Sequence, residues 1–153
     1  MARLLVLAHA PSPNLARLRD AVLDGARDPY IEGVETVSKA PLEAGPEDVR
    51  AADAVLLMTP ENLGYMSGAL KDFFDRSFYE LLDRTDALPY AAVIRAGQDG
   101  TGTRRAIESI CGGLKWKAVQ DPLICRGKWR DAFEAEAREL GATMAAGLEA
   151  GIF

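Results

Sequence analysis

The chain is poor in cysteine and histidine, and these shortages exclude several kinds of site. There are two cysteines and one histidine among 153 residues. Cys111 and Cys125 lie in different predicted elements, neither has a CxxC partner, and one histidine cannot complete a zinc site with them. We therefore expect no metal centre and two reduced, largely buried thiols, as is usual for free cysteine.

Long hydrophobic runs and an excess of basic charge are also missing. No apolar stretch approaches membrane-spanning length, and the first residues lack a basic segment followed by an apolar one. The formal net charge is −5 with both signs interleaved, whereas a nucleic-acid binder usually presents a basic face. We expect a cytoplasmic protein that binds neither nucleic acid nor membranes.

Apolar residues, in contrast, are plentiful at 48% of the chain. They suffice for the core of one compact domain spanning residues 1–153. Short apolar runs bounded by turn formers alternate with stretches of helical period. Strands are predicted at 3–9, 34–39, 54–58, 90–95 and 116–125, the last interrupted by Asp121-Pro122. Helices are predicted at 13–26, 70–82, 104–114 and 129–148, with a helical turn at 47–51.

Strands that alternate with helices favour a parallel sheet covered on both faces, with right-handed crossovers. The pattern predicts an α/β fold with a doubly wound five-stranded parallel sheet in the order 2-1-3-4-5. Ligands bind such sheets at the carboxyl ends of the strands. Three predicted loops meet at that edge: 9–14, 59–65 and 96–102.

The first and third loops have features suited to a ligand. Ser12 is a good N-cap and Pro13 a good first helical residue, so the helix N-terminus points at the sheet edge and favours an anion. Three glycines between 96 and 102 allow positive φ and close approach of the backbone to a flat ligand. On residues alone, Ser12-Pro13 as a simple helix cap and 96–102 as a plain turn stay open.

The second loop and its flanks provide a family resemblance. A strand ending in Thr59-Pro60-Glu61, a short loop with Asn62 and Gly64, and then S-G-A-L-K-D-F-F-D resembles the NAD(P)H-dependent FMN reductases. These are flavoproteins of the flavodoxin-like family. The resemblance implies a flavodoxin-like fold, bound FMN, NAD(P)H as electron donor and a helix that often helps to build a homodimer.

The resemblance also implies which residues contact FMN. The loop after the first strand would hold the phosphate, the loop after the third strand would run beside the flavin ring, and the glycine-rich loop would border the pyrimidine side. Matched onto this sequence, the cofactor-binding residues are His9, Ser12, Asn14, Thr59, Pro60, Glu61, Asn62, Leu63, Gly64, Tyr65, Gly97, Gln98, Asp99 and Gly102.

Some of these assignments have plainer alternatives. Members of the family commonly place further Ser or Thr in the phosphate loop where this chain has Pro11, Pro13 and Leu15, so two amide donors are missing. His9 could be an ordinary turn residue and Glu61 a surface charge. Tyr65 could stack on the ring or pack across a dimer.

The function expected is an FMN-binding oxidoreductase that uses NAD(P)H to reduce a flavin, quinone or similar small acceptor. The flavin performs the chemistry, and no side chain is assigned as catalytic. The alternatives are a flavodoxin-like electron carrier and a flavodoxin-fold scaffold that binds no flavin. A phospho-switch receiver domain is rejected, because it requires an acidic pair after strand one and an Asp ending strand three, where this chain has His9-Ala10 and Thr59.

A homodimer is expected from the aromatic content of the helix predicted at 70–82. Phe73, Phe74, Phe78 and Tyr79 exceed what one buried helical face needs, and Tyr79 lies off the main apolar stripe. That leaves an aromatic side chain for a partner.

Overall fold

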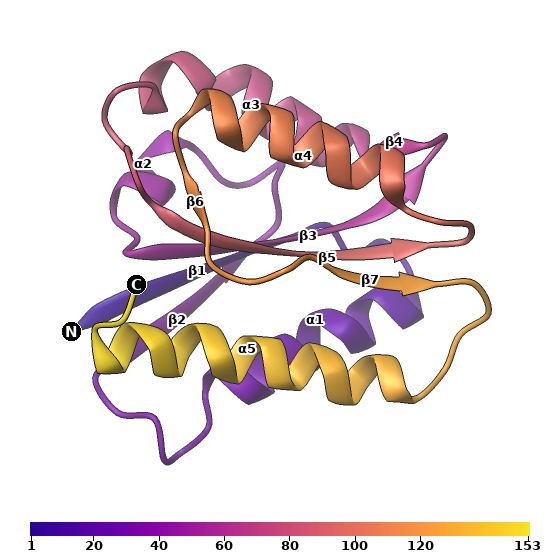
Figure 1. Ribbon diagram of the computed structural model, residues 1–153, viewed down its shortest axis with the longest axis horizontal. Coiled ribbons are helices and arrows are strands. Elements are labelled where there is room, and N and C mark those ends of the chain that lie inside the picture. Colours follow the sequence, from indigo (N-terminus) through magenta and orange to yellow (C-terminus); the bar gives the residue numbers. More distant parts are fainter.

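The computed structural model describes residues 1–153 as one sheet between two layers of helices (Figure 1). The strands are β1 (Ala2–Ala8), β2 (Val34–Lys39), β3 (Ala54–Asn62), β4 (Tyr65–Met66), β5 (Pro89–Ala96), β6 (Lys117–Ala118) and β7 (Leu123–Arg126). The helices are α1 (Pro13–Ala26), α2 (Pro46–Arg50), α3 (Gly68–Leu81), α4 (Thr101–Gly113) and α5 (Ala132–Ala150).

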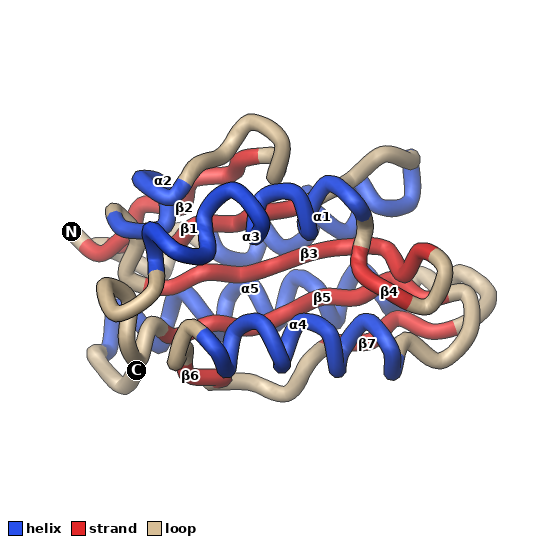
Figure 2. The backbone as a smooth tube through the Cα atoms, turned by 90° about the horizontal axis from the view of Figure 1, so that it is seen from above, coloured by secondary structure: helices blue, strands red, loops and turns tan.

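The parallel strands follow the predicted order. They run β2-β1-β3-β5, with β6 and β7 both pairing with β5 at the far edge (Figure 2). The predicted fifth strand is thus two strands, separated near Asp121-Pro122, because proline cannot donate to the ladder. Together with the short antiparallel β4, this gives seven strands instead of the five predicted.

The sheet has an apolar cluster on each face, which explains its nearly continuous hydrophobic strands. Successive β1 residues alternate: Leu5 and Leu7 belong to the cluster under α3 and α4, whereas Leu4 and Val6 belong to the cluster over α1 and α5. All four leucine and valine side chains are fully buried or nearly so. Full burial of each contributes about 1.5–3 kcal/mol of transfer free energy.

Helices α1 and α5 approach each other closely because glycines replace larger residues where the helices touch. A Cβ added at Gly25 would overlap the Arg138 carbonyl oxygen, and one added at Gly141 would overlap that of Val22. The inner residues predicted for these helices are buried: Leu15, Leu18, Val22, Ala26, Phe133, Ala137, Leu140 and Met144. The two helices form a tightly packed layer below the sheet.

The two cysteines are free and buried, as predicted. Burial raises the pKa of the Cys125 thiol to about 11 and raises that of Cys111 further. Both thiols are therefore protonated and unreactive at neutral pH. No helix is long and apolar enough to cross a membrane, and no group of three or more His, Cys, Asp or Glu side chains could hold a metal ion.

Candidate functional site

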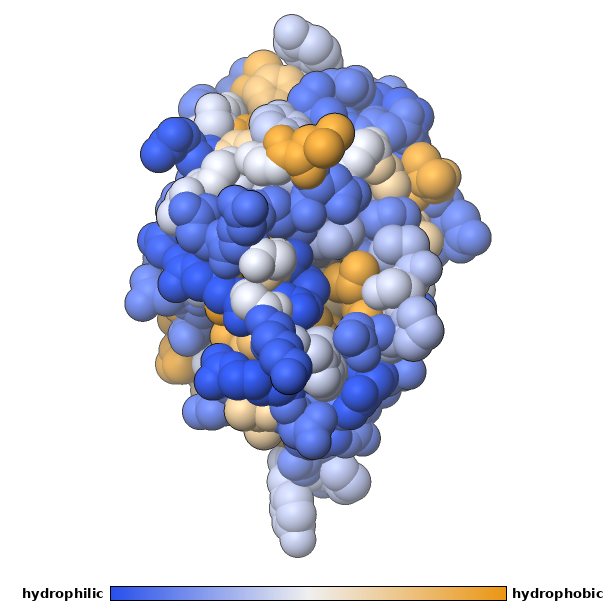
Figure 3. All heavy atoms as spheres, turned by 90° about the vertical axis from the view of Figure 1, so that its right-hand side faces the viewer, coloured by the Kyte–Doolittle hydropathy of each residue, from blue (hydrophilic) through white to orange (hydrophobic).

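The carboxyl ends of β1, β3 and β5 meet at one end of the sheet, on the right of Figure 1. All three predicted ligand-facing segments lie there. Figure 3 shows this end directly, with a mostly hydrophilic surface and several small, separate apolar patches. The three segments differ in how they are built.

The segment predicted as a loop at 59–65 is a β-hairpin. β3 continues to Asn62, past the predicted end at Met58, and β4 returns antiparallel with Asn62 opposite Tyr65. Leu63 and Gly64 have φ of 53° and 74°, so both central residues of the two-residue turn are left-handed, as a type I′ turn requires. The prediction of a loop over 59–65 was wrong in extent: only Leu63 and Gly64 form the turn, and the residues on either side belong to strands.

Thr59 and Pro60 lie beneath the hairpin and are buried. The Thr59 hydroxyl donates to the Pro60 carbonyl at 2.9 Å and accepts the Ser67 N–H at 2.9 Å. Ser67 in turn caps α3, since its Oγ accepts the Leu70 N–H at 3.2 Å. Thr59 therefore ties the base of the hairpin to the start of α3.

The glycine-rich segment is shorter than predicted, because α4 begins at Thr101 and not at Arg104. Of its three glycines only Gly100 has positive φ, at 72°. The Asp99 carboxylate accepts the Thr101 N–H and the Thr101 hydroxyl, each at 3.0 Å. These hydrogen bonds lower the pKa of Asp99, first through the backbone N–H and then through the hydroxyl, and they fix the first turn of α4.

The hairpin and the glycine-rich segment touch each other directly. A Cβ added at Gly102 would overlap the Gly64 carbonyl oxygen, so only glycine permits this approach. A Cβ added at Gly97 would have no atom within 4 Å, so the backbone there is open to solvent. These glycines were predicted to let the backbone approach a flat ligand. At Gly102 the backbone instead approaches the Gly64 carbonyl of the hairpin.

A cleft of about 500 Å³ lies between these two segments. Its size falls within the range of ordinary small-molecule sites. Its lining residues are all among those predicted: Glu61, Leu63, Gly64, Gly97, Gln98, Asp99 and Gly102. Leu63 is the one large apolar side chain, and it is fully exposed at the hairpin tip.

The first segment, 9–14, does not line this cleft. Ser12 caps α1 through the Leu15 N–H, which it accepts at 3.3 Å, as the helix-cap alternative predicted. Pro11 and Pro13 have no N–H, and Asn14 is exposed in the first turn of α1. The amides of Ser12 and Asn14 are left as the donors that this helix start can offer an anion.

His9 stands where β1 ends. Its backbone N–H donates to the Met58 carbonyl at 3.0 Å, and its side chain is partly buried. Burial lowers the pKa of the imidazole from its ordinary value of 6.5, because it disfavours the charged form. The imidazole is therefore neutral at neutral pH.

The remaining predicted residues, Asn62 and Tyr65, lie on the hairpin outside the cleft lining and are exposed. Sequence reasoning missed Arg126, whose Nε donates to the Asp99 carbonyl at 2.6 Å. No short-range pattern links Arg126 to Asp99, because 27 residues separate them. Ser67 was also missed, although a serine directly before an apolar periodic run is a cap signal.

The fold is that of the flavodoxins. A flavodoxin from the domain Archaea superposes with a TM-score of 0.80 at 16% identity, over 96% of this chain and 99% of that one. A WrbA-like flavodoxin from Agrobacterium tumefaciens gives a TM-score of 0.74 at 17% identity, over 99% of each chain.

Sequence comparison defines the family. The model of the NADPH-dependent FMN reductase family matches residues 7–129, and the chain belongs to that family. It is 33% identical over 110 residues to a flavodoxin from Aquifex aeolicus, covering 72% of this chain and 58% of that protein. It is also 33% identical over 97 residues to an NAD(P)H dehydrogenase (quinone) from Archaeoglobus fulgidus, covering 49% of this chain and 51% of that protein. The chain thus spans little more than half the length of these relatives.

Proposed function

We propose that the protein is an FMN-binding oxidoreductase that takes electrons from NAD(P)H and passes them to a flavin, quinone or similar small acceptor. The observation that supports it best is the cleft between the hairpin and the glycine-rich segment. It lies at the ligand-binding edge of a doubly wound sheet, in a chain of the NADPH-dependent FMN reductase family.

The residues present fit FMN. The open backbone at Gly97 leaves room for a flat group, and Leu63 offers an apolar surface at the opposite rim. The N-terminus of α1, with Ser12 and Asn14, suits the phosphate at the same edge of the sheet. Bound FMN would supply hydride acceptance and electron transfer to the acceptor.

The protein's own contribution is binding and orientation. The close approach of Gly64 and Gly102 sets the width of the cleft, and the Thr59 and Ser67 hydrogen bonds hold the hairpin at its base. Asp99 is ionised at neutral pH, as an exposed carboxylate is, and the hydrogen bonds from Thr101 lower its pKa further. No side chain in the cleft is needed as a general acid or base, and we propose none.

An absorbance spectrum of purified protein, soaked with excess FMN and freed of unbound flavin, tests the proposal. We expect a retained flavin spectrum and stoichiometric FMN-dependent oxidation of NAD(P)H. Tight FMN without turnover would instead favour the flavodoxin-like electron carrier, which the 33% identity to a flavodoxin keeps as the second candidate. Absence of retained flavin would favour the scaffold.

We further propose a homodimer that uses α3. Tyr79 on this helix is 84% exposed, and its ring packs edge-on against Phe78 at 5.4 Å between centroids. An exposed aromatic of this size is typical of interfaces. Sedimentation of the wild type and of Tyr79→Glu would test it: we expect a dimer and a monomer respectively, and a monomeric wild type would contradict it.

A further inference from the structure

Four cations on β7, on the segment after it and on α4 have no ion-pair partner, and one of them, Arg126, contacts a residue that lines the cleft. Arg126, Lys128 and Arg130 lie at and after the end of β7, and Arg105 lies on α4; none makes an ion pair. Ten of the eighteen Lys and Arg residues do make ion pairs. Arg126 therefore brings to the edge of the cleft a positive charge that no ion pair holds.

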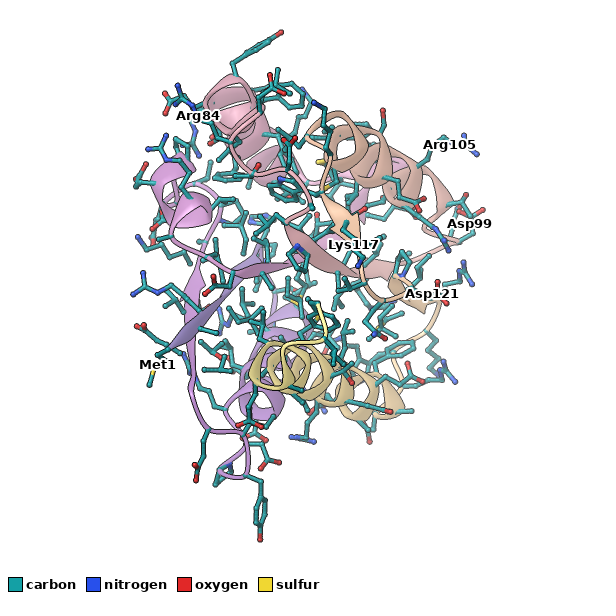
Figure 4. The ribbon with its side chains drawn as sticks, turned by 60° about the vertical axis from the view of Figure 1, so that its left-hand side comes forward. Met1, Arg84, Asp99, Arg105, Lys117 and Asp121 are labelled. Atoms are coloured by element: carbon teal, nitrogen blue, oxygen red, sulfur yellow. The ribbon has the colours of Figure 1, made fainter.

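Arg126 is fixed at the edge of the cleft. Its Nε donates to the carbonyl of Asp99, a lining residue, and its two Nη groups make no hydrogen bond within the protein. The Gly127 N–H donates to the Ala96 carbonyl at 2.8 Å, so the chain leaving β7 runs beside the glycine-rich segment. Figure 4 shows Arg105 extending on the same side of the molecule as Asp99.

The segment that holds these cations is anchored from below. Trp129 packs edge-on against Phe133 at 5.6 Å, and the guanidinium groups of Arg17 and Arg95 lie 5.0 Å and 5.8 Å from its ring centroid. Arg95 also donates to the carbonyls of Ala96 and Cys125. The cationic segment is therefore held in place before any ligand binds, which lowers the entropic cost of binding.

The opposite rim differs in charge. There the cleft is bordered by the hairpin, with Glu61 and Leu63 and no cation. A dinucleotide whose nicotinamide enters the cleft must direct its phosphates across one rim or the other. The hairpin rim carries the Glu61 carboxylate and no cation. The other rim carries the Asp99 carboxylate together with the Arg126 guanidinium, whose free Nη groups can donate to phosphate oxygens.

We propose that Arg126 binds the phosphates of the reduced nicotinamide dinucleotide. This rests on the proposed function, because it assumes that the donor's nicotinamide enters this cleft. Arg126 is a binding residue at the rim, and its free Nη groups suit a bidentate interaction with phosphate oxygens.

Calorimetric titration with NADP⁺ tests the assignment without turnover. Arg126→Gln keeps much of the side-chain length and removes the charge. We expect it to raise the Kd for NADP⁺ by about tenfold or more, the size typical of removing a charged hydrogen bond. The FMN spectrum should be unchanged, and Arg126→Lys should recover part of the affinity.

Arg84→Gln is the matched control. Arg84 is also exposed and without an ion pair, but it lies on the other side of the molecule from Asp99 (Figure 4). We expect its Kd for NADP⁺ to equal that of the wild type. Raising the salt concentration should weaken binding to the wild type and to Arg84→Gln more than to Arg126→Gln.

The outcomes separate this proposal from the proposed function. FMN-dependent NADPH oxidation with an NADP⁺ Kd that Arg126→Gln leaves unchanged would overturn the Arg126 site alone. An Arg126-dependent NADP⁺ Kd in a protein that retains no FMN would support the site and contradict the proposed function. An effect of Arg126→Gln confined to reduction of a protein acceptor would overturn the site in favour of a protein-docking surface.

Discussion

Two regions lie at the same edge of the sheet but are held in place differently. In one region the hairpin and the glycine-rich segment fix each other: Gly102 packs against the Gly64 carbonyl, and a cleft lies between them. The other region, between β1 and α1, is fixed by its own helix, through the hydrogen bond from the Leu15 N–H to Ser12. One region is organised by long-range packing and the other by local capping.

The difference indicates how each region should respond to mutation. A change at Gly64 or Gly102 alters the relative position of two elements, so stability and the cleft should change together. A change at Ser12 alters one helix cap, so stability and anion binding can be separated by the choice of replacement. Substitutions in the two regions therefore test the contrast between them.

The largest effect is expected for Gly102→Ala. Its new Cβ would overlap a backbone oxygen that cannot rotate away, so the hairpin and α4 must separate. We expect a decrease of about 1–3 kcal/mol in the free energy of unfolding, typical of overpacking, and weaker FMN binding. Urea denaturation and flavin titration measure the two effects.

Gly97→Ala is the control within the same segment. Gly97 has no positive φ, and nothing lies within 4 Å of the added Cβ. Stability should therefore stay within about 0.5 kcal/mol of the wild type, as at other open surface sites. Equal decreases in stability for the two alanine variants would show that the packing of Gly102 on Gly64 does not fix the cleft.

Leu63→Gly should stabilise the protein while weakening FMN binding. Leu63 adopts φ 53°, a left-handed conformation that costs a non-glycine residue roughly 1–2 kcal/mol, and its side chain is fully exposed. Glycine removes that cost in part, so we expect the free energy of unfolding to rise by about 1 kcal/mol. FMN affinity should fall, because the cleft no longer has its one large apolar side chain. If the variant bound FMN as tightly as the wild type, Leu63 would have no role at the ring.

Two replacements at Ser12 separate capping from phosphate binding. Ser12→Ala removes the cap and should cost about 1 kcal/mol of stability. Ser12→Asp retains a capping oxygen, so stability should be kept, but its charge would repel a phosphate at the same helix start. We expect FMN affinity to fall further in the aspartate variant. Unchanged affinity there would place the phosphate elsewhere.

The smallest effect is expected for His9. Because it is the only histidine, its imidazole NMR resonances can be assigned without ambiguity. Its pKa is lowered by burial, so between the folded value and 6.5 the unfolded chain binds more protons. The contribution of neutral, partly buried His9 to the free energy of unfolding is thus fully present above pH 6.5, and it is lost as the pH falls through the pKa of the folded state. An NMR titration should show the low pKa without FMN and a higher one with FMN, if the phosphate lies beside the imidazole. An identical pKa in both would exclude that arrangement.

The sequence predicted the parts of the fold that depend on local pattern. The apolar runs at 54–58 and 90–95 became the central strands, and Asp121-Pro122 divided the last strand as proline chemistry requires. The order of the parallel strands is the predicted one, and that prediction rested on the known order of doubly wound sheets of this kind. These features need little knowledge of distant parts of the chain.

The parts that were missed depend on tertiary packing. Thr59-Pro60 is typical of a turn, yet Pro60 pairs with Arg95 within the sheet, and Leu63 adopts a backbone conformation unusual for leucine. Neither the packing of Gly102 on Gly64 nor the hydrogen bond of Arg126 to Asp99 leaves a short-range signal. Sequence reasoning named every residue that lines the cleft, but it could not tell that 9–14 lies apart from it.

The most direct test of the proposed cofactor site is FMN titration of the wild type, Gly102→Ala and Gly97→Ala, followed by absorbance after removal of unbound flavin. We predict that the wild type retains a flavin spectrum and that Gly102→Ala loses most of it, while urea denaturation shows Gly97→Ala to be as stable as the wild type. A wild type that retains no flavin after soaking would contradict the assignment of the cleft to FMN.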